Sequence, residues 1–220
     1  MTTYTTHTQE STAVGGDLNI LGNENYQLQL AKSVTDSSGS VTYNMVYQSQ
    51  LLAPDMEIQW TTNYGLNWTA NIPNPGATVN YAGNWQPCAA GESYDLNNVG
   101  AWVPNQSNPN AKPNCLNVGN NDYGESVYIS DGVQDASGNW SPIWVSPDKL
   151  LKQSGGEYEP LEAITLWYQE GSQTSTMVST QQTKLQQYMM APNEGPVYFS
   201  YSTAEKKWLE PQNTPFTLPS

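Results

Sequence analysis

The segment ITLWYQEGSQTSTM, residues 164–177, decides how the whole chain is interpreted. Ile164, Leu166 and Tyr168 recur at every second position, and this period predicts a strand with one buried face. Trp167 lies out of phase with them, so its indole needs a second apolar surface. An opposing sheet, a partner protomer, a sugar ring or a flat aromatic ligand would all provide one, and the pattern leaves the choice open.

The same alternation continues outward along the chain and predicts an all-β fold. Residues 26–30 and 41–47 alternate on either side of a polar turn, as in a hairpin. Further strands are expected at residues 56–60, 66–72, 79–81, 93–96, 100–103, 125–130, 140–145, 163–168, 174–180 and 197–201. One helix is expected at 181–190, where Leu185, Tyr188 and Met189 share a face. Strands at such short spacing favour a single β-sandwich over alternating strands and helices.

The division of the chain follows from the same pattern. Residues 1–24 are polar and predict an N-terminal arm with one short strand at 18–21, while residues 25–220 predict the β-sandwich domain. Residues 73–122 are rich in Asn and Pro, which predicts long surface loops. Loops of that length usually carry function or are mobile.

The charge of the chain excludes several kinds of partner. Twenty acidic residues oppose seven basic ones, all lysine, for a net charge of −13. Such a surface repels DNA, RNA and anionic lipid, so no nucleic-acid or membrane partner is expected. No apolar run reaches the roughly 18–20 residues of a membrane span, and no secretory signal pattern is visible. A cytoplasmic location is therefore expected. Eight Trp and fourteen Tyr provide most of the area available for a core.

The chain lacks the usual residue patterns of an enzyme. His7 is the single histidine, which removes a Ser-His-Asp triad, and no zinc or phosphate-loop spacing occurs. Glu157, Glu159 and Glu162 offer carboxylates for glycoside hydrolysis, but their setting beside glycines and a proline is more typical of a solvated loop. A protein that is not an enzyme is expected.

Two loops contain enough oxygen ligands for a hard cation. They suggest a Ca²⁺ or Mg²⁺ site formed by Asp122, Glu125, Asp131 and Asp135. Polar turns of this composition are also common in β proteins without metal. Cys88 and Cys115 allow either a disulfide or two free thiols.

Several segments resemble a family of basidiomycete fruit-body proteins that includes pigmented chromoproteins. The resemblance covers roughly residues 25–190, and it depends on YQLQLAKSV (26–34), YNMVYQS (43–49), Trp60, Trp68 and above all LWYQEGSQTSTM (166–177). It implies a sandwich similar to actinoporins and fungal fruit-body lectins, and a homodimer. It also implies a non-covalent chromophore of the 3H-indol-3-one type and is compatible with a divalent cation. It brings no catalytic residues.

A pigment site follows from this resemblance together with the opening segment. The predicted ligand-binding residues are Trp167, Tyr168, Thr174, Ser175, Thr176, Met177, Trp60 and Trp68, although core packing explains the last two equally well. In this hypothesis Trp167 stacks on the pigment and the hydroxyls of residues 172–176 bind its polar edge.

Two other classes of function remain open. The alternative to a chromoprotein is a carbohydrate-binding lectin, since Trp, Tyr, Asn and Asp also suit sugars. A membrane-active toxin of the actinoporin kind is disfavoured, because residues 1–24 lack lysine and a helical apolar stripe.

Overall fold

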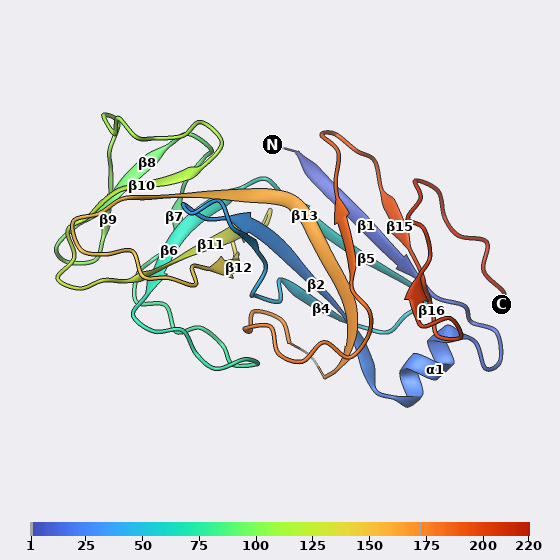
Figure 1. Ribbon diagram of the computed structural model, residues 1–220. Helices are drawn as coiled ribbons and strands as arrows, with labels where there is room; N and C mark the ends of the chain where they lie inside the picture. Colours follow the sequence, from blue (N-terminus) through green and yellow to red (C-terminus); the bar gives the residue numbers. More distant parts are fainter. Residues whose placement is uncertain (1, 172) are drawn as a thin grey trace.

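The computed structural model describes residues 2–171 and 173–220, and this part of the chain is nearly all β (Figure 1). The expected all-β class is therefore confirmed. The described residues contain one short helix, α1 (Asp17–Asn23). They contain no helix that is long and apolar enough to cross a lipid bilayer.

The largest sheet has the antiparallel pair β2 (Tyr26–Thr35) and β13 (Gly156–Glu170) at its centre. Its order is β3-β2-β13-β10-β8-β9, with β4 added to β2 and β14 added to β13. The remaining strands are β3 (Val41–Thr42), β4 (Gln48–Leu51), β8 (Ser93–Leu96), β9 (Trp102–Pro104), β10 (Leu116–Asn121) and β14 (Gln186–Met189).

Three smaller sheets complete the fold. In the first, β1 (Thr3–Gln9) lies between β15 (Val197–Phe199) and β5 (Asp55–Thr61). The second has the order β12-β11-β6-β7 and comprises β6 (Tyr64–Thr69), β7 (Gln86–Pro87), β11 (Tyr128–Gln134) and β12 (Trp140–Val145). The third pairs β16 (Tyr201–Ser202) with β17 (Lys207–Trp208).

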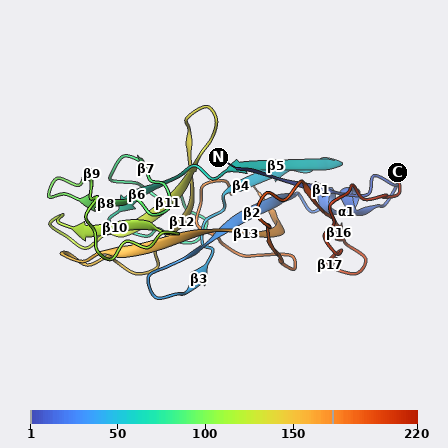
Figure 2. The ribbon, with the colours of Figure 1, turned by 90° about the horizontal axis from the view of Figure 1, so that it is seen from above.

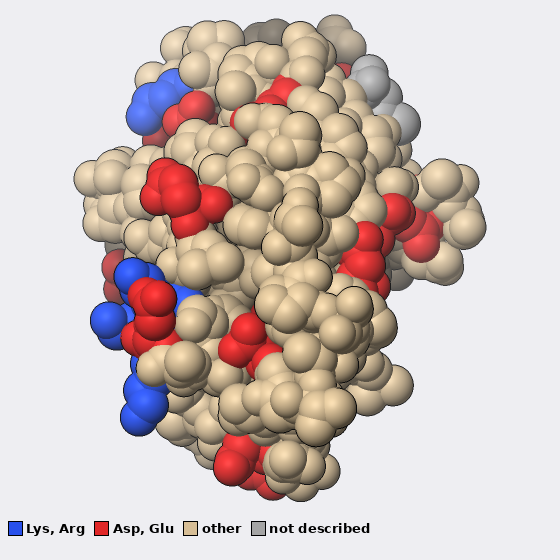
Figure 3. All heavy atoms as spheres, turned by 90° about the vertical axis from the view of Figure 1, so that its right-hand side faces the viewer, with Lys and Arg blue, Asp and Glu red and all other residues tan. Residues whose placement is uncertain are grey.

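The strands form two groups along an elongated molecule. Figures 1 and 2 place β6 to β12 at one end and β1, β16 and α1 towards the other, and the long strand β13 extends between them. Acidic side chains are scattered over the face in Figure 3, whereas lysines gather along one edge of it. The positive charge on this face is therefore confined to one edge, whereas the negative charge is spread over it.

The main core lies on one face of the central pair. Leu28 and Leu30 of β2 and Ile164 and Leu166 of β13 are 0–1% exposed and belong to this core. The alternate residues of both strands, including Trp167, point to the opposite face. We call these the inner and outer faces. The strand phase that the sequence predicts for residues 164–168 is thus confirmed.

Three predicted elements are different in the structure. Residues 3–9, which were expected in a polar arm, form β1 and pair along their length with β5. The strand expected at 18–21 lies within helix α1, which buries Leu21. The helix expected at 181–190 is wrong, because residues 186–189 form β14 and pair with β13. The three residues of its presumed apolar face are separated, since Tyr188 packs against the main core whereas Leu185 is 37% and Met189 is 58% exposed.

Further strand predictions fail in three segments. Residues 43–47, 79–81 and 174–180 form no strand, and of the strand expected at 41–47 only β3 is present. Near them are only isolated bridges, Thr78 with Thr176 and Met45 with Met177.

Candidate functional site

Trp167 is fully enclosed by its own chain. Its exposed fraction is 0%, and it packs with Ala31 and Val46, against which Tyr43 and Val178 also lie. Its Nε1 donates a hydrogen bond of 2.9 Å to Oε1 of Gln169. The second apolar surface that the sequence requires is therefore a layer of the same protomer.

That layer consists of two segments, residues 43–47 and 174–178, which we call the outer cover. Val46 N donates to Thr176 O at 2.9 Å, and Ser175 N donates to Val46 O at 2.8 Å. Met45 and Met177 form one bridge and share a small buried cluster. Backbone hydrogen bonds hold the two segments of the outer cover together. Because this layer covers Trp167, no ligand ring can stack on its indole.

The other predicted pigment residues have structural contacts as well. Tyr168 lies on the inner face, is stacked on Trp208 with ring centroids 5.5 Å apart, and donates to Glu10 Oε1 at 2.7 Å. Thr174 Oγ1 accepts from Ser49 N at 2.8 Å. Ser172, which was expected to bind the pigment edge, lies outside the described residues. The two cavities described below are lined by none of the eight predicted residues.

Trp60 and Trp68, the remaining two predicted aromatics, belong to the core. Core packing was the alternative that the sequence left open for them. Trp60 is 2% and Trp68 is 4% exposed, and both lie in the main core. Trp68 Nε1 donates to Gly100 O at 2.9 Å, and its ring packs on Tyr123 with centroids 4.7 Å apart.

The four predicted metal ligands are not brought together. Asp135 accepts hydrogen bonds from its own turn at Asn139, and these hold the pKa of its carboxyl below the usual value. Asp122 accepts from Asn120, and Glu125 is exposed. Residues 2–171 and 173–220 contain no group of three or more His, Cys, Asp or Glu arranged to hold a metal ion.

Asp131 lies in a different environment from the other three. Its exposed fraction is 0%, and neither carboxylate oxygen has a hydrogen-bond partner among the described residues. Burial raises the pKa of this carboxyl well above its usual value. The expectation that Asp131 is a loop ligand is wrong, because it is part of β11 and lies on the inner side of its sheet, opposite Leu66.

The cysteines are both free and buried, so the disulfide alternative is not realised. Burial raises the pKa of the Cys88 thiol to about 12, with a further contribution from Asp131. A thiol that stays protonated is a poor nucleophile. Cys88 is therefore a packing residue.

The acidic segment before residue 163 is a strand and not the expected loop, since Glu157, Glu159 and Glu162 all lie in β13. Lys32 Nζ, which is 0% exposed, lies 2.9 Å from Glu162 Oε2. Figure 1 shows this long strand along the centre of the molecule.

Glu162 is the centre of a buried polar cluster. Its carboxylate accepts from Trp60 Nε1 at 2.7 Å and from the hydroxyl of Tyr64, in addition to Lys32. Burial alone would raise its pKa, but the Lys32 charge and these hydrogen bonds outweigh burial and hold the pKa below the usual value. This carboxylate is saturated by internal donors, so it is poorly suited to meet a substrate.

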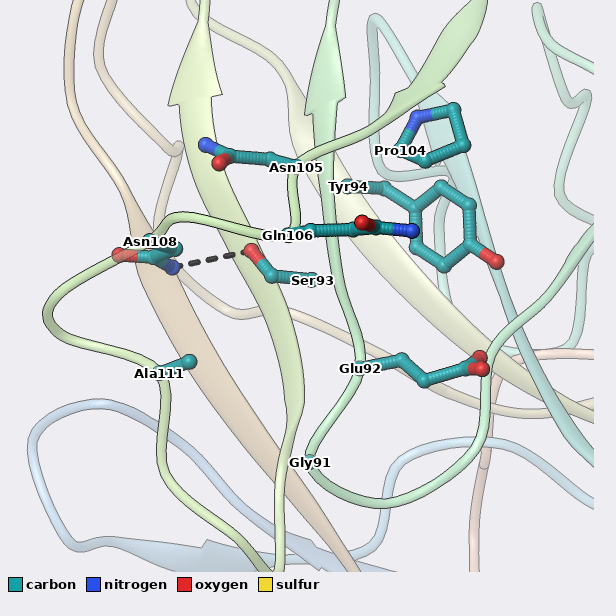
Figure 4. A pocket seen from close by; sticks show the side chains of 9 residues that line it. All are labelled: Gly91, Glu92, Ser93, Tyr94, Pro104, Asn105, Gln106, Asn108 and Ala111. Atoms are coloured by element: carbon teal, nitrogen blue, oxygen red, sulfur yellow. Dashed lines mark hydrogen bonds between the residues drawn. The ribbon is translucent and has the colours of Figure 1, made fainter.

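The largest cavity of those described here lies in the region of 73–122. Its volume is about 420 Å³, and it opens between β8, β9 and the segment that follows β9. Figure 4 shows its lining residues Gly91, Glu92, Ser93, Tyr94, Pro104, Asn105, Gln106, Asn108 and Ala111. We call it the loop cavity. The Asn/Pro-rich loops predicted a functional region here, but nothing in the sequence singled out these side chains.

Hydrogen bonds from Asn side chains fix the shape of the loop cavity. Asn108 Nδ2 donates to Ser93 Oγ and Asn105 Nδ2 to Asp95 Oδ1, both at 2.9 Å. Asn117 is fully buried and donates to the carbonyl oxygen of Glu92 at 3.0 Å. The walls are therefore ordered before any ligand arrives.

Different chemical groups face the loop cavity from its two sides. In Figure 4 the Tyr94 ring and the Glu92 side chain project to one side, Gln106 reaches across towards Tyr94, and Asn105 and Asn108 lie on the other side. An aromatic face, a carboxylate and amides can together bind a ligand that has both apolar C–H surface and hydroxyl groups.

Comparisons with protein-family models, with curated proteins and with solved structures find no match to this chain.

Proposed function

We propose that the protein is a lectin that binds carbohydrate in the loop cavity without transforming it. The observation that carries this proposal is the combination of Tyr94, Glu92 and Gln106 in one cavity of about 420 Å³. That volume lies in the range of about 300–1,000 Å³ that small-molecule sites occupy.

The chemistry of the lining supports a sugar over other small molecules. A pyranose presents C–H groups on one face, which stack on an aromatic ring, and hydroxyls around its edge, which pair with carboxylates and amides. The prior ordering of the walls by Asn105, Asn108 and Asn117 reduces the entropy lost on binding.

The number of carboxylates supports binding over hydrolysis. Glycosidases generally use two carboxyl groups on opposite sides of the scissile bond. Of the described residues that line the loop cavity, Glu92 alone carries a carboxylate. The expected lack of enzymatic activity therefore becomes part of this proposal.

A glycan array with the purified protein tests the proposal, followed by titration of the best glycan. Tyr94→Ala should abolish measurable binding, Tyr94→Phe should retain most of it because the ring remains, and Glu92→Gln should weaken it about tenfold. Glu125→Gln is the matched control, since this exposed acid lies outside the cavity. Equal binding by Tyr94→Ala and the wild type would refute the proposal.

Pigment binding, a homodimer and an actinoporin-like sandwich are further proposals that follow from the family resemblance. Pigment binding is the weaker of the two functions, because the indole of Trp167 has no free face for stacking. The visible spectrum of protein from its native source tests it. An absorbance band that survives in Trp167→Phe would locate the pigment elsewhere.

A further inference from the structure

A second hollow lies on the outer face of the central sheet, beyond the edge of the outer cover. Its volume is about 260 Å³, and its lining includes Ser33, Val41, Ala163, Thr165, Gln187 and Met189. We call it the sheet groove. Register places Thr165 beside Ala31 on β2 and beside Gln187 on β14, so three neighbouring strands form its floor.

One group on this floor lacks a hydrogen-bond partner. Thr165 is 1% exposed, and its Oγ1 has no partner among residues 2–171 and 173–220. A buried hydroxyl without a partner is energetically costly, so native proteins rarely retain one without a reason. Thr165 is also a lining residue, so a ligand in the sheet groove can supply the missing partner once the hydroxyl turns towards it.

The backbone of the floor has no comparable need. β13 pairs with β2 on one side and with β14 on the other around Thr165, so the strand has no free edge there. A peptide would bring a row of backbone groups that require partners. β13 offers no such row, which disfavours a peptide added as a strand beside Thr165.

The rim of the sheet groove carries two exposed apolar side chains beside the exposed Gln187. Val41 and Met189 are each 58% exposed, although both are hydrophobic. None of the described residues that line the groove is charged. A charged ligand would lose hydration here without gaining a counter-charge, so the groove favours a neutral molecule.

We propose that the sheet groove binds a small neutral molecule that has an apolar body and a carbonyl or ether oxygen, which accepts a hydrogen bond from Thr165. The apolar body lies against Val41 and Met189 and removes their side chains from water. Methionine adapts its shape to such a body. This site is separate from the loop cavity and does not depend on carbohydrate binding.

The fluorescent ketone prodan tests the proposal, because it is neutral and flat and its emission responds to hydrogen bonding at its carbonyl. The wild type should bind prodan at one saturable site. Thr165→Val should raise the dissociation constant about two- to tenfold and shift the emission to the blue, because the donor is lost. Thr165→Ser should keep the wild-type emission.

Variants at the rim distinguish prodan binding in the sheet groove from nonspecific binding to exposed apolar side chains. Met189→Lys should weaken prodan binding more than tenfold. Val99→Lys should leave it unchanged, since Val99 is 76% exposed and lies outside the groove. The proposal fails if the wild type does not bind prodan, if Thr165→Val matches the wild type in affinity and emission, or if Val99→Lys weakens binding as much as Met189→Lys.

Discussion

Glu162 and Asp131 are both carboxylates at the inner side of their sheets, but they differ in their partners. Glu162 accepts hydrogen bonds from Lys32, Trp60 and Tyr64, and its pKa lies below the usual value. Asp131 has no partner among the described residues, and its pKa lies well above the usual value. The comparison shows that a cation and hydrogen-bond donors offset the effect of burial on Glu162, whereas burial acts unopposed on Asp131.

Glu10 is intermediate between these two extremes. Its Oε1 accepts from the Tyr168 hydroxyl at 2.7 Å and from Tyr201 N at 3.1 Å, but no cation lies beside it among its described contacts. Burial raises its pKa to about 8, even though both hydrogen bonds act in the opposite direction. Glu10 is therefore mostly protonated at neutral pH.

The largest expected effect comes from removing the saturated carboxylate. Glu162→Ala leaves the Lys32 ammonium buried and two aromatic donors unpaired, so it should lower the free energy of unfolding by about 3–5 kcal/mol. Urea denaturation of the variant measures this loss.

Two further variants test whether the loss of stability comes from the unpaired charge of Lys32. The double variant Lys32→Met, Glu162→Leu removes both charges and should recover most of the loss. Glu159→Ala, on the same strand, should change stability by less than about 0.5 kcal/mol. An equally large loss in the double variant would show that shape, and not charge pairing, is what Glu162 provides.

The second prediction concerns pH and Glu10. Because its pKa is raised in the folded state, the native protein retains a proton that the unfolded chain releases above its ordinary pKa of 4.5. This contribution is fully present below that pKa and is lost as the pH rises through about 8. From about pH 5.5 to about pH 7.5 the free energy of unfolding should fall by about 2.5 kcal/mol.

The variant Glu10→Gln tests this assignment, since the amide is neutral throughout that interval and can accept the same two hydrogen bonds. Urea unfolding at both pH values should show a smaller loss of stability in the variant than in the wild type. Identical pH profiles would contradict the assignment of the titration to Glu10.

The smallest effect is expected at the unpaired acid. Asp131→Leu removes a buried group without partners while keeping a similar shape, so it should raise the free energy of unfolding by about 1–3 kcal/mol. A thermal melt together with urea denaturation checks the sign. A loss of stability of similar size would show that the Asp131 carboxyl makes a net favourable contribution to the fold.

The strands that could be predicted from the sequence are those in which apolar residues alternate and the alternate positions form a buried face. Met56, Ile58 and Trp60 alternate in the sequence and are 1–2% exposed in β5. The phase of Trp167 was also predicted correctly. What covers it was not, because pairing between residues 43–47 and 174–178 depends on contacts about 130 positions apart, which a local pattern does not encode.

The failures at 3–9 and 181–190 have a related cause. Both segments are polar or helix-like by composition, yet β1 pairs with β5 on one side and β15 on the other, and residues 186–189 pair with β13, so their backbone groups find partners there. Pairing with a neighbouring strand outweighs intrinsic propensity. The length of the loops at 73–122 indicated the region of the loop cavity. The site itself is identified only by the folded chain, which brings Glu92, Tyr94 and Gln106 together.

The position of β1 has a consequence for synthesis of the chain. One edge of β1 pairs with β5, which follows within about fifty residues, but its other edge waits for β15, whose register joins Thr8 to Phe199. That edge stays bare until residues 197–199 have left the ribosome. Such a high contact order slows folding, and an unpaired edge invites association with other nascent chains. Chaperone demand should therefore concentrate on this first strand.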